Sequence, residues 1–226
     1  MIYGNPSSNS VQMIKNSLLV KEWNRLGVFD ELKRMPYPAT EEEVVMELQY
    51  LVTLQKTVDE KRMQYIERVD KELFTVMSEW LASYGVTEDP MQIKHNLDLY
   101  DPIIDYLKVI YNRPRPFQTA GAYGVPLYPM LKTDASDSSY PGGHTLLALF
   151  FRHIYMQRHP ELAKDMMHFV LDIAHTRLQG GVHYPSDNIF SMRVYKHIKP
   201  WMSATHNFYI KGTWQHISLG VYFNYE

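Results

Sequence analysis

No glycine or proline occurs between Glu41 and Tyr84. Apolar residues recur through this stretch at spacings of three and four, which places them along one face of a helix. A single helix of this length would span about 65 Å, whereas a compact domain of this size is only about 45 Å across. The stretch therefore predicts helices joined by a break, which we place in the charged segment 57–62.

The rest of the chain is also mostly helical in its pattern. Residues 117–141 are the exception, because glycine, proline and short polar residues predict a long irregular loop there. The 226 residues suffice for one domain with a proper hydrophobic core. We therefore predict a single all-α helical-bundle domain over 1–226. Its other helices are predicted over 10–26, 90–111 with an interruption before Pro102, 143–158, 160–179, and from 186 to 195 or beyond.

The two ends of the chain differ from this pattern. Residues 1–10 are polar and contain glycine, proline and serine, which predicts a loose arm. In the tail, apolar residues alternate strictly from 217 to 225, which is the period of a strand. We therefore expect residues 205–226 to form an extended tail or a short β-hairpin. The apolar residues of this tail also allow a contact between copies of the chain, so a homo-oligomer stays an alternative.

Composition narrows the partners and the location. The formal net charge is −2, so nothing draws the whole molecule toward nucleic acid. There is no cysteine, which excludes disulfides and thiolate metal sites. The longest apolar run, 146–151, is far shorter than the roughly 20 residues of a membrane helix, and the N-terminus lacks the pattern of a secretory signal. We expect a soluble, cytoplasmic protein with no membrane span.

Three segments carry residues with recognisable chemistry, namely 108–116, 140–144 and 176–187. The first and the third supply Lys108, Arg115 and Arg177. The planar fork of arginine suits a tetrahedral oxyanion, and lysine adds a point charge. Phosphoryl transfer asks a protein mainly for such positioning and charge stabilisation. The three cations therefore predict a phosphate-binding site.

Two glycines, two histidines and a carboxylate complete this chemistry. Gly142 and Gly143 lie where a loop enters a helix, so free backbone N–H groups could hold an anion there. His183 precedes Asp187 by four residues, so the carboxylate can accept from one ring nitrogen and leave the other free to attack. His144, from another segment, could protonate the leaving oxygen.

Each of these residues also has a plain structural interpretation. Arg113 and Arg115 each directly precede a proline and fit a solvated turn equally well. His144 on its own would more often cap or pack a helix than catalyse. His144, His183 and Asp187 could in principle hold a metal ion. Three nearby cations would repel such an ion, so we expect no metal.

Taken together, the three segments resemble the signature of the type 2 phosphatidic acid phosphatase/vanadium haloperoxidase superfamily. That signature reads Lys-x6-Arg-Pro, then Pro-Ser-Gly-His, then Ser-Arg-x5-His-x3-Asp. Residues 108–116 match the first part without gaps. Residues 141–144 match the second with Gly142 in place of serine, and 176–187 match the third with Thr176 in place of serine. The similarity covers roughly residues 105–190.

The resemblance implies a helical bundle and a set of roles. It implies attack by His183 to give a phosphohistidine, with Asp187 orienting the ring and His144 acting as the acid. It also implies that Gly142 lacks a hydroxyl that would donate to a phosphate oxygen, while the backbone N–H groups of Gly142 and Gly143 remain. A lost donor of this kind can cost about 10- to 1,000-fold in rate. The implied phosphate ligands are Lys108, Arg115 and Arg177.

We therefore expect a soluble, metal-independent phosphatase of the acid-phosphatase-like kind. It would hydrolyse small phosphomonoesters through the phosphohistidine and would need no cofactor. Two alternatives stay open. One is a vanadate-dependent haloperoxidase, in which the pocket holds vanadate as a phosphate mimic with His183 as its axial ligand, although such enzymes are usually larger than this chain. The other is a non-catalytic phosphate- or anion-binding module that lost activity with the change at Gly142.

Overall fold

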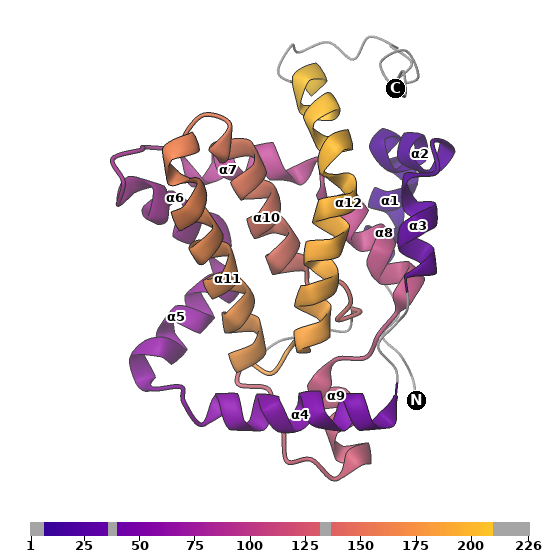
Figure 1. Ribbon diagram of the computed structural model, residues 1–226, viewed down its shortest axis with the longest axis vertical. Coiled ribbons are helices and arrows are strands. Elements are labelled where there is room, and N and C mark those ends of the chain that lie inside the picture. Colours follow the sequence, from indigo (N-terminus) through magenta and orange to yellow (C-terminus); the bar gives the residue numbers. More distant parts are fainter. Residues whose placement is uncertain (1–6, 36–39, 132–136, 210–226) are drawn as a thin grey trace.

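The computed structural model describes residues 7–35, 40–131 and 137–209, with side chains up to Met202 in the last range. Within these ranges the chain forms helices and no strand (Figure 1). The predicted all-α class is therefore confirmed. The alternating segment 217–225, for which a hairpin was considered, lies outside the described residues.

Three long helices form the centre of the bundle. In chain order they are α10 (Gly143–Met156), α11 (Ala163–Gln179) and α12 (Pro185–Tyr209). Figure 1 shows α10 between α11 and α12, and it packs against both. Its side chains Leu146, Phe150 and Phe151 are fully buried. A helix that is apolar on most of its circumference belongs in the interior, which explains the central position of α10.

The long stretch without glycine or proline contains a break between Gln55 and Glu60, which overlaps the charged segment 57–62 where we predict one. The helix α4 (Glu41–Gln55) starts with a capping box between Thr40 and Glu43, and α5 (Glu60–Lys71) is capped by Asp59. A second break at Glu72 separates α5 from α6 (Leu73–Ala82) and was not predicted. The apolar rhythm continues through Glu72 unchanged, so periodicity carried no sign of it. Figure 1 shows α4 lying across one end of the bundle.

The N-terminal segment is two helices instead of the single predicted one. These are α1 (Ser8–Asn16) and α2 (Leu18–Arg25), and the hydroxyl of Ser17 caps α2 by accepting from the Val20 N–H at 3.1 Å. Because α1 begins at Ser8, the prediction of a loose arm is wrong for residues 8–10, while residues 1–6 lie outside the described ranges. Gly27 ends this region with a left-handed backbone at φ 73°, directly after the predicted helix end at residue 26, and α3 (Val28–Arg34) follows.

The remaining connections are close to the predictions, with two corrections. The interruption before Pro102 is confirmed, because α7 (Pro90–Asp98) and α8 (Asp101–Tyr111) are separate. The prediction of an irregular loop over 117–141 is wrong at its start, because α9 (Pro116–Thr119) and the 3-10 helix η1 (Ala120–Tyr123) lie there. The prediction of an extended tail from residue 205 is wrong for residues 205–209, because α12 continues to Tyr209. A short 3-10 helix, η2 (Pro160–Leu162), precedes α11.

Among the described residues, no helix combines the length and the apolar character that crossing a membrane requires.

Candidate active site

The predicted site residues come together at the end of the bundle where four helix termini meet (Figure 1). The chain folds back between these helices, so segments far apart in sequence share this end. The residues Arg115, Arg177, His183 and Asp187 are all buried. The site residues lie at or next to helix ends: Lys108 near the end of α8, Arg115 in the turn after it, Gly143 and His144 at the start of α10, Arg177 near the end of α11, and Asp187 in the first turn of α12.

His183 and Asp187 form the pair that their spacing predicted. The Nδ1 atom of His183 lies 3.1 Å from Oδ2 of Asp187, and the same oxygen accepts from the Tyr184 N–H at 2.8 Å. A tight turn brings His183 close to Asp187, because Gly181 has a left-handed backbone at φ 73° and α12 begins at Pro185. A carboxylate on Nδ1 leaves Nε2 as the ring nitrogen that can attack. That Nε2 atom lies 3.4 Å from Nη1 of Arg115.

Arg113 holds the other oxygen of Asp187, and sequence reasoning missed this role. Its Nη1 atom donates to Asp187 Oδ1 at 2.6 Å, and its guanidinium lies 3.8 Å from the ring centroid of Tyr184. The solvated-turn interpretation is wrong for Arg113, which is only 3% exposed. Burial raises the pKa of the Asp187 carboxyl, and the bonds from Arg113 and the Tyr184 N–H oppose that shift. An arginine directly before a proline gives no sequence signal of burial.

Two of the three predicted cations converge on a carboxylate of the chain itself. Asp137 forms an ion pair with Lys108 and accepts from Arg115 Nη2 at 2.6 Å. Burial acts to raise the pKa of the Asp137 carboxyl, but the two cations outweigh it and hold the pKa well below its usual range. Asp137 belongs to a polar run in the predicted loop, and no motif marks it. Its carboxylate is an anion bound where the sequence predicts phosphate.

The third cation, Arg177, is only partly satisfied by its protein partner. Its Nη2 atom contacts Oδ1 of Asp70 at 2.7 Å. Its Nε and Nη1 atoms are buried and have no hydrogen-bond partner among the described residues. Burial, more than any neighbouring charge, lowers the pKa of the Arg177 guanidinium. Buried donors without partners are rare in native proteins, so Arg177 favours a bound anion at this position.

Both predicted catalytic histidines are held in their neutral form. Burial lowers the pKa of the His183 imidazole well below its usual range, and the nearby cations, led by Arg115, add to the shift. His144 shows the same direction for the same reason, with Arg177 as the first of its cationic neighbours. A hydrogen bond with the backbone of Asp70 opposes the shift at His144. Both rings therefore stay unprotonated near neutral pH, and each keeps one ring nitrogen with a free lone pair.

The two glycines differ in what they offer an anion. The Gly142 N–H donates to Ser191 Oγ at 3.0 Å, so the expectation that it remains available is wrong. A side chain at position 142 would point toward α12, with its Cβ 3.0 Å from Asn188 Oδ1 and 3.3 Å from Thr145 Oγ1. At Gly143 a Cβ would lie 3.7 Å from Lys108 Nζ. This is an ordinary van der Waals distance, so the space at Gly143 would admit a small side chain, unlike the space at Gly142.

The charges of the site suit an oxyanion. Lys108, Arg115 and Arg177 surround the imidazole of His183, and each of them adds to its pKa shift. Over the described ranges, no group of three or more histidine, aspartate or glutamate side chains is arranged to hold a metal ion.

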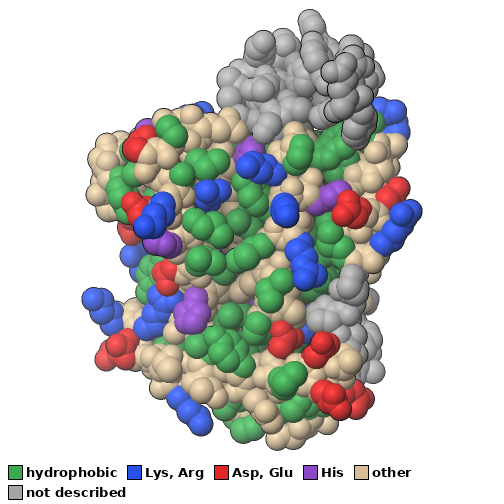
Figure 2. Space-filling model, in the orientation of Figure 1, with side chains coloured by type: hydrophobic (Ala, Val, Ile, Leu, Met, Phe, Trp, Pro, Cys, Tyr) green, Lys and Arg blue, Asp and Glu red, His purple; other side chains and the backbone are tan. Residues whose placement is uncertain are grey.

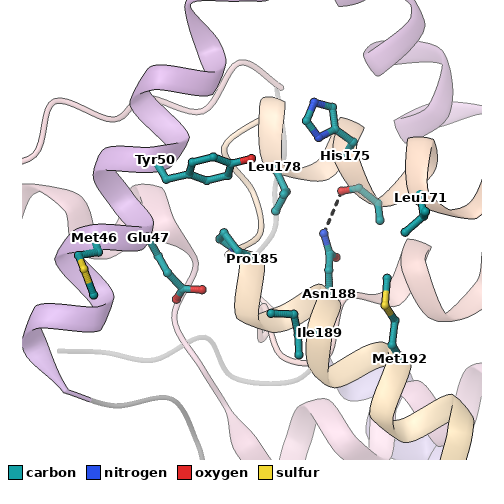
Figure 3. A pocket seen from close by; sticks show the side chains of 11 residues that line it. Met46, Glu47, Tyr50, Leu171, His175, Leu178, Pro185, Asn188, Ile189 and Met192 are labelled. Atoms are coloured by element: carbon teal, nitrogen blue, oxygen red, sulfur yellow. Dashed lines mark hydrogen bonds between the residues drawn. The ribbon is translucent and has the colours of Figure 1, made fainter.

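A separate groove lies beside the site, between α4, α11 and α12 (Figure 3). Its volume is about 610 Å³, and none of the three cations lines it. In Figure 2, hydrophobic side chains gather on this face above α4. The polar residues in its wall are Glu47, His175 and Asn188.

Of the comparisons with known proteins, the one with family models found a match. Searches of curated proteins and of solved structures returned no match. A family model for the PAP2 superfamily matches residues 99–194. Every residue of the predicted site lies inside this segment, and its similarity to the superfamily supports phosphatase-like or related activity. The match over residues 99–194 confirms the resemblance that the motifs indicated.

Proposed function

We propose that this protein hydrolyses phosphomonoesters without a metal ion, through a phosphohistidine formed on His183. One observation carries the proposal. The Nδ1 atom of His183 is held by Asp187 at 3.1 Å, while its Nε2 atom faces Arg115 at 3.4 Å. The nucleophilic nitrogen thus lies beside a cation that can hold the phosphate it would attack.

Binding of the phosphoryl group would use the three cations. Arg177 contributes the buried Nε and Nη1 donors that have no partner among the described residues. Lys108 and Arg115 contribute after the phosphoryl group displaces the Asp137 carboxylate, with which both are paired. Charge-assisted hydrogen bonds to phosphate are about twice as strong as neutral ones. The three cations supply the charge stabilisation that phosphoryl transfer demands.

The reaction would proceed in two displacements. In the first, the lone pair on His183 Nε2 forms a bond to phosphorus as the bond from phosphorus to the leaving oxygen breaks. His144 gives a proton to that oxygen, and Asp187 accepts a hydrogen bond from the charged ring of His183. In the second, water attacks the phosphohistidine and releases phosphate, while His144 takes the proton from the water.

The protonation states fit these roles in different ways. Attack requires neutral His183, and the lowered pKa of its imidazole keeps it neutral in the resting site. His144 must carry a proton in the first step, although the same kind of shift favours its neutral form in the resting site. A bound phosphomonoester dianion adds negative charge beside His144 and raises its pKa. Substrate binding would therefore charge the acid at the step that needs it.

Release of phosphate from an aryl phosphate, measured in the presence of a chelator, tests the proposal. We expect turnover without added metal, and competitive inhibition by vanadate. The substitution His183→Ala should lower kcat by at least about 1,000-fold, while His175→Ala, in the neighbouring groove, should leave it within about twofold. Full turnover by His183→Ala would show that His183 is not the nucleophile. Halide oxidation by peroxide after loading with vanadate would instead favour a haloperoxidase.

A further inference from the structure

A carboxylate from the N-terminal half of the chain lies against the helix that carries Asp187. Glu47 belongs to α4, outside the segment that matches the family model. Its Oε1 atom accepts from the Ser186 N–H at 2.6 Å, and its Oε2 atom accepts from Ser186 Oγ at 2.8 Å. The first N–H groups of a helix have no partner within it, and the helix dipole favours a negative charge there. Glu47 thus caps the start of α12 from outside.

The same carboxylate also holds the arginine that contacts Asp187. Glu47 Oε2 accepts from Arg113 Nη2 at 3.1 Å. Arg113 in turn donates from Nη1 to Asp187 Oδ1 at 2.6 Å. The guanidinium is planar and rigid, so a carboxylate on each side fixes its orientation. A continuous path of contacts therefore runs from Glu47 through Arg113 and Asp187 to His183.

The side chains of this path are shielded from water, so the charged contacts between them are stronger than they would be on the surface. The side chain of Arg113 is 2% exposed, that of Asp187 is fully buried, and that of Glu47 is 16% exposed. When one partner of a buried charge pair is removed, the other is left without compensation. Without the charge of Glu47, Arg113 would lose one of its two carboxylate partners, while its Nη1 atom would still donate to Asp187 Oδ1 at 2.6 Å and to Ser186 Oγ at 2.7 Å. Its Nη2 atom would then lack the charged acceptor that sets the tilt of the guanidinium.

We propose that Glu47 is a positioning residue for the phosphoryl transfer, acting through Arg113 and through the first turn of α12. This inference rests on the proposed function. Glu47 has no contact with Lys108, Arg115 or Arg177 among the interactions of the described residues. Its loss should therefore change the orientation of the nucleophile and leave the affinity for phosphate unchanged. The segment 99–194 would then depend on α4 to complete its active site.

The substitution Glu47→Gln tests this role, because glutamine keeps the shape and one acceptor but removes the charge. We expect kcat to fall about 10- to 100-fold, since small misplacements of reacting groups have effects of that size. KM and the Kd for vanadate should stay within about twofold. Glu42→Gln is the matched control, because Glu42 is exposed on the same helix and the change in charge is identical. It should leave kcat unchanged.

A purely structural role for Glu47 predicts an effect on stability instead of an effect on kcat. In that case Glu47→Gln would lower the melting temperature, and kcat per folded molecule would stay at the wild-type value. This outcome would overturn the positioning role. So would a rise in KM that accounts for the whole loss of kcat/KM, because it would place the effect of Glu47 in binding.

A second measurement is independent of turnover. Nitrogen-15 NMR of the histidine side chains, with His183 assigned by comparison with His183→Gln, reports which ring nitrogen carries the proton. In the wild type we expect the proton on Nδ1, slow to exchange; in Glu47→Gln this signal should shift and exchange faster. If the wild type hydrolyses no phosphoester, the proposed function fails while this readout still tests Glu47. If the wild type is active and neither readout changes in Glu47→Gln, the positioning role is wrong and the proposed function stands.

Discussion

Each arginine near the site is held by at least one carboxylate, and these contacts leave different amounts of binding capacity. Arg113 is shared between Asp187 and Glu47, so it serves as a bridge. Arg115 pairs with Asp137, which reaches it from a loop. Arg177 leaves two buried donors without a partner among the described residues, because Asp70 contacts only its Nη2 atom. The three arginines therefore differ in role although all three are buried.

Asp137 gives a prediction at the scale of a single residue. Its carboxylate competes with any incoming anion for Lys108 and Arg115, so Asp137→Asn should bind phosphate and vanadate more tightly. The carboxylate is 41% exposed, and solvent screening limits what such a pair contributes. We therefore expect Kd to fall about three- to tenfold at low salt, which titration calorimetry can measure.

Glu161→Gln serves as the control for Asp137→Asn, because Glu161 is exposed, carries the same charge and lies in η2, directly before the end of α11 that is opposite to Arg177. Its affinity for phosphate should match the wild type. Unchanged or weaker binding by Asp137→Asn would contradict the competition. The difference between Asp137→Asn and the wild type should also shrink at high salt, since screening weakens both the internal pair and the bound anion.

At the scale of elements, Gly142 lies directly before α10 and packs against side chains of α12. A Cβ there would meet Asn188 Oδ1 at 3.0 Å, so Gly142→Ala should lower the free energy of unfolding by about 1–3 kcal/mol. Gly142→Ser should lower the free energy of unfolding by less, because the serine hydroxyl can form a hydrogen bond with Asn188 or Ser191. Thermal unfolding of both variants measures this order.

The activity of Gly142→Ser separates two views of the missing hydroxyl. Since position 142 faces α12, we expect the variant to gain no more than about twofold in kcat/KM. A gain of tenfold or more would show that a serine hydroxyl does reach the bound phosphate, as the superfamily signature implies. Initial rates with the aryl phosphate distinguish the two results.

The helices and the site were predictable to different degrees, for physical reasons. Periodicity located the helices because burial imposes it, but the breaks at Ser17 and Glu72 leave the rhythm intact and so were invisible. The motif residues could be placed because spacing along a chain constrains local geometry, as for His183 and Asp187. Glu47 reaches its partners across a large sequence separation, which only the fold decides.

At the scale of the whole molecule, several buried groups tie folding to pH. The pKa values of His144 and His183 are lowered, so the folded state holds both rings neutral while the unfolded chain protonates them below about pH 6.5. The unfolded state then binds more protons, and stability rises with pH in this window. Asp101 acts in the opposite direction, because burial raises the pKa of its carboxyl to about 6 and the folded state keeps the proton longer.

We therefore predict that the wild type loses stability as pH falls from 7 toward 5, by up to about 1.4 kcal/mol per pH unit for each histidine. The double variant His144→Gln/His183→Gln isolates this contribution, since it keeps Asp101. Its free energy of unfolding, measured with denaturant at each pH in a buffer without phosphate, should fall less steeply than that of the wild type. Parallel pH dependences would contradict the lowered pKa values, and with them the neutral resting state on which nucleophilic attack by His183 depends.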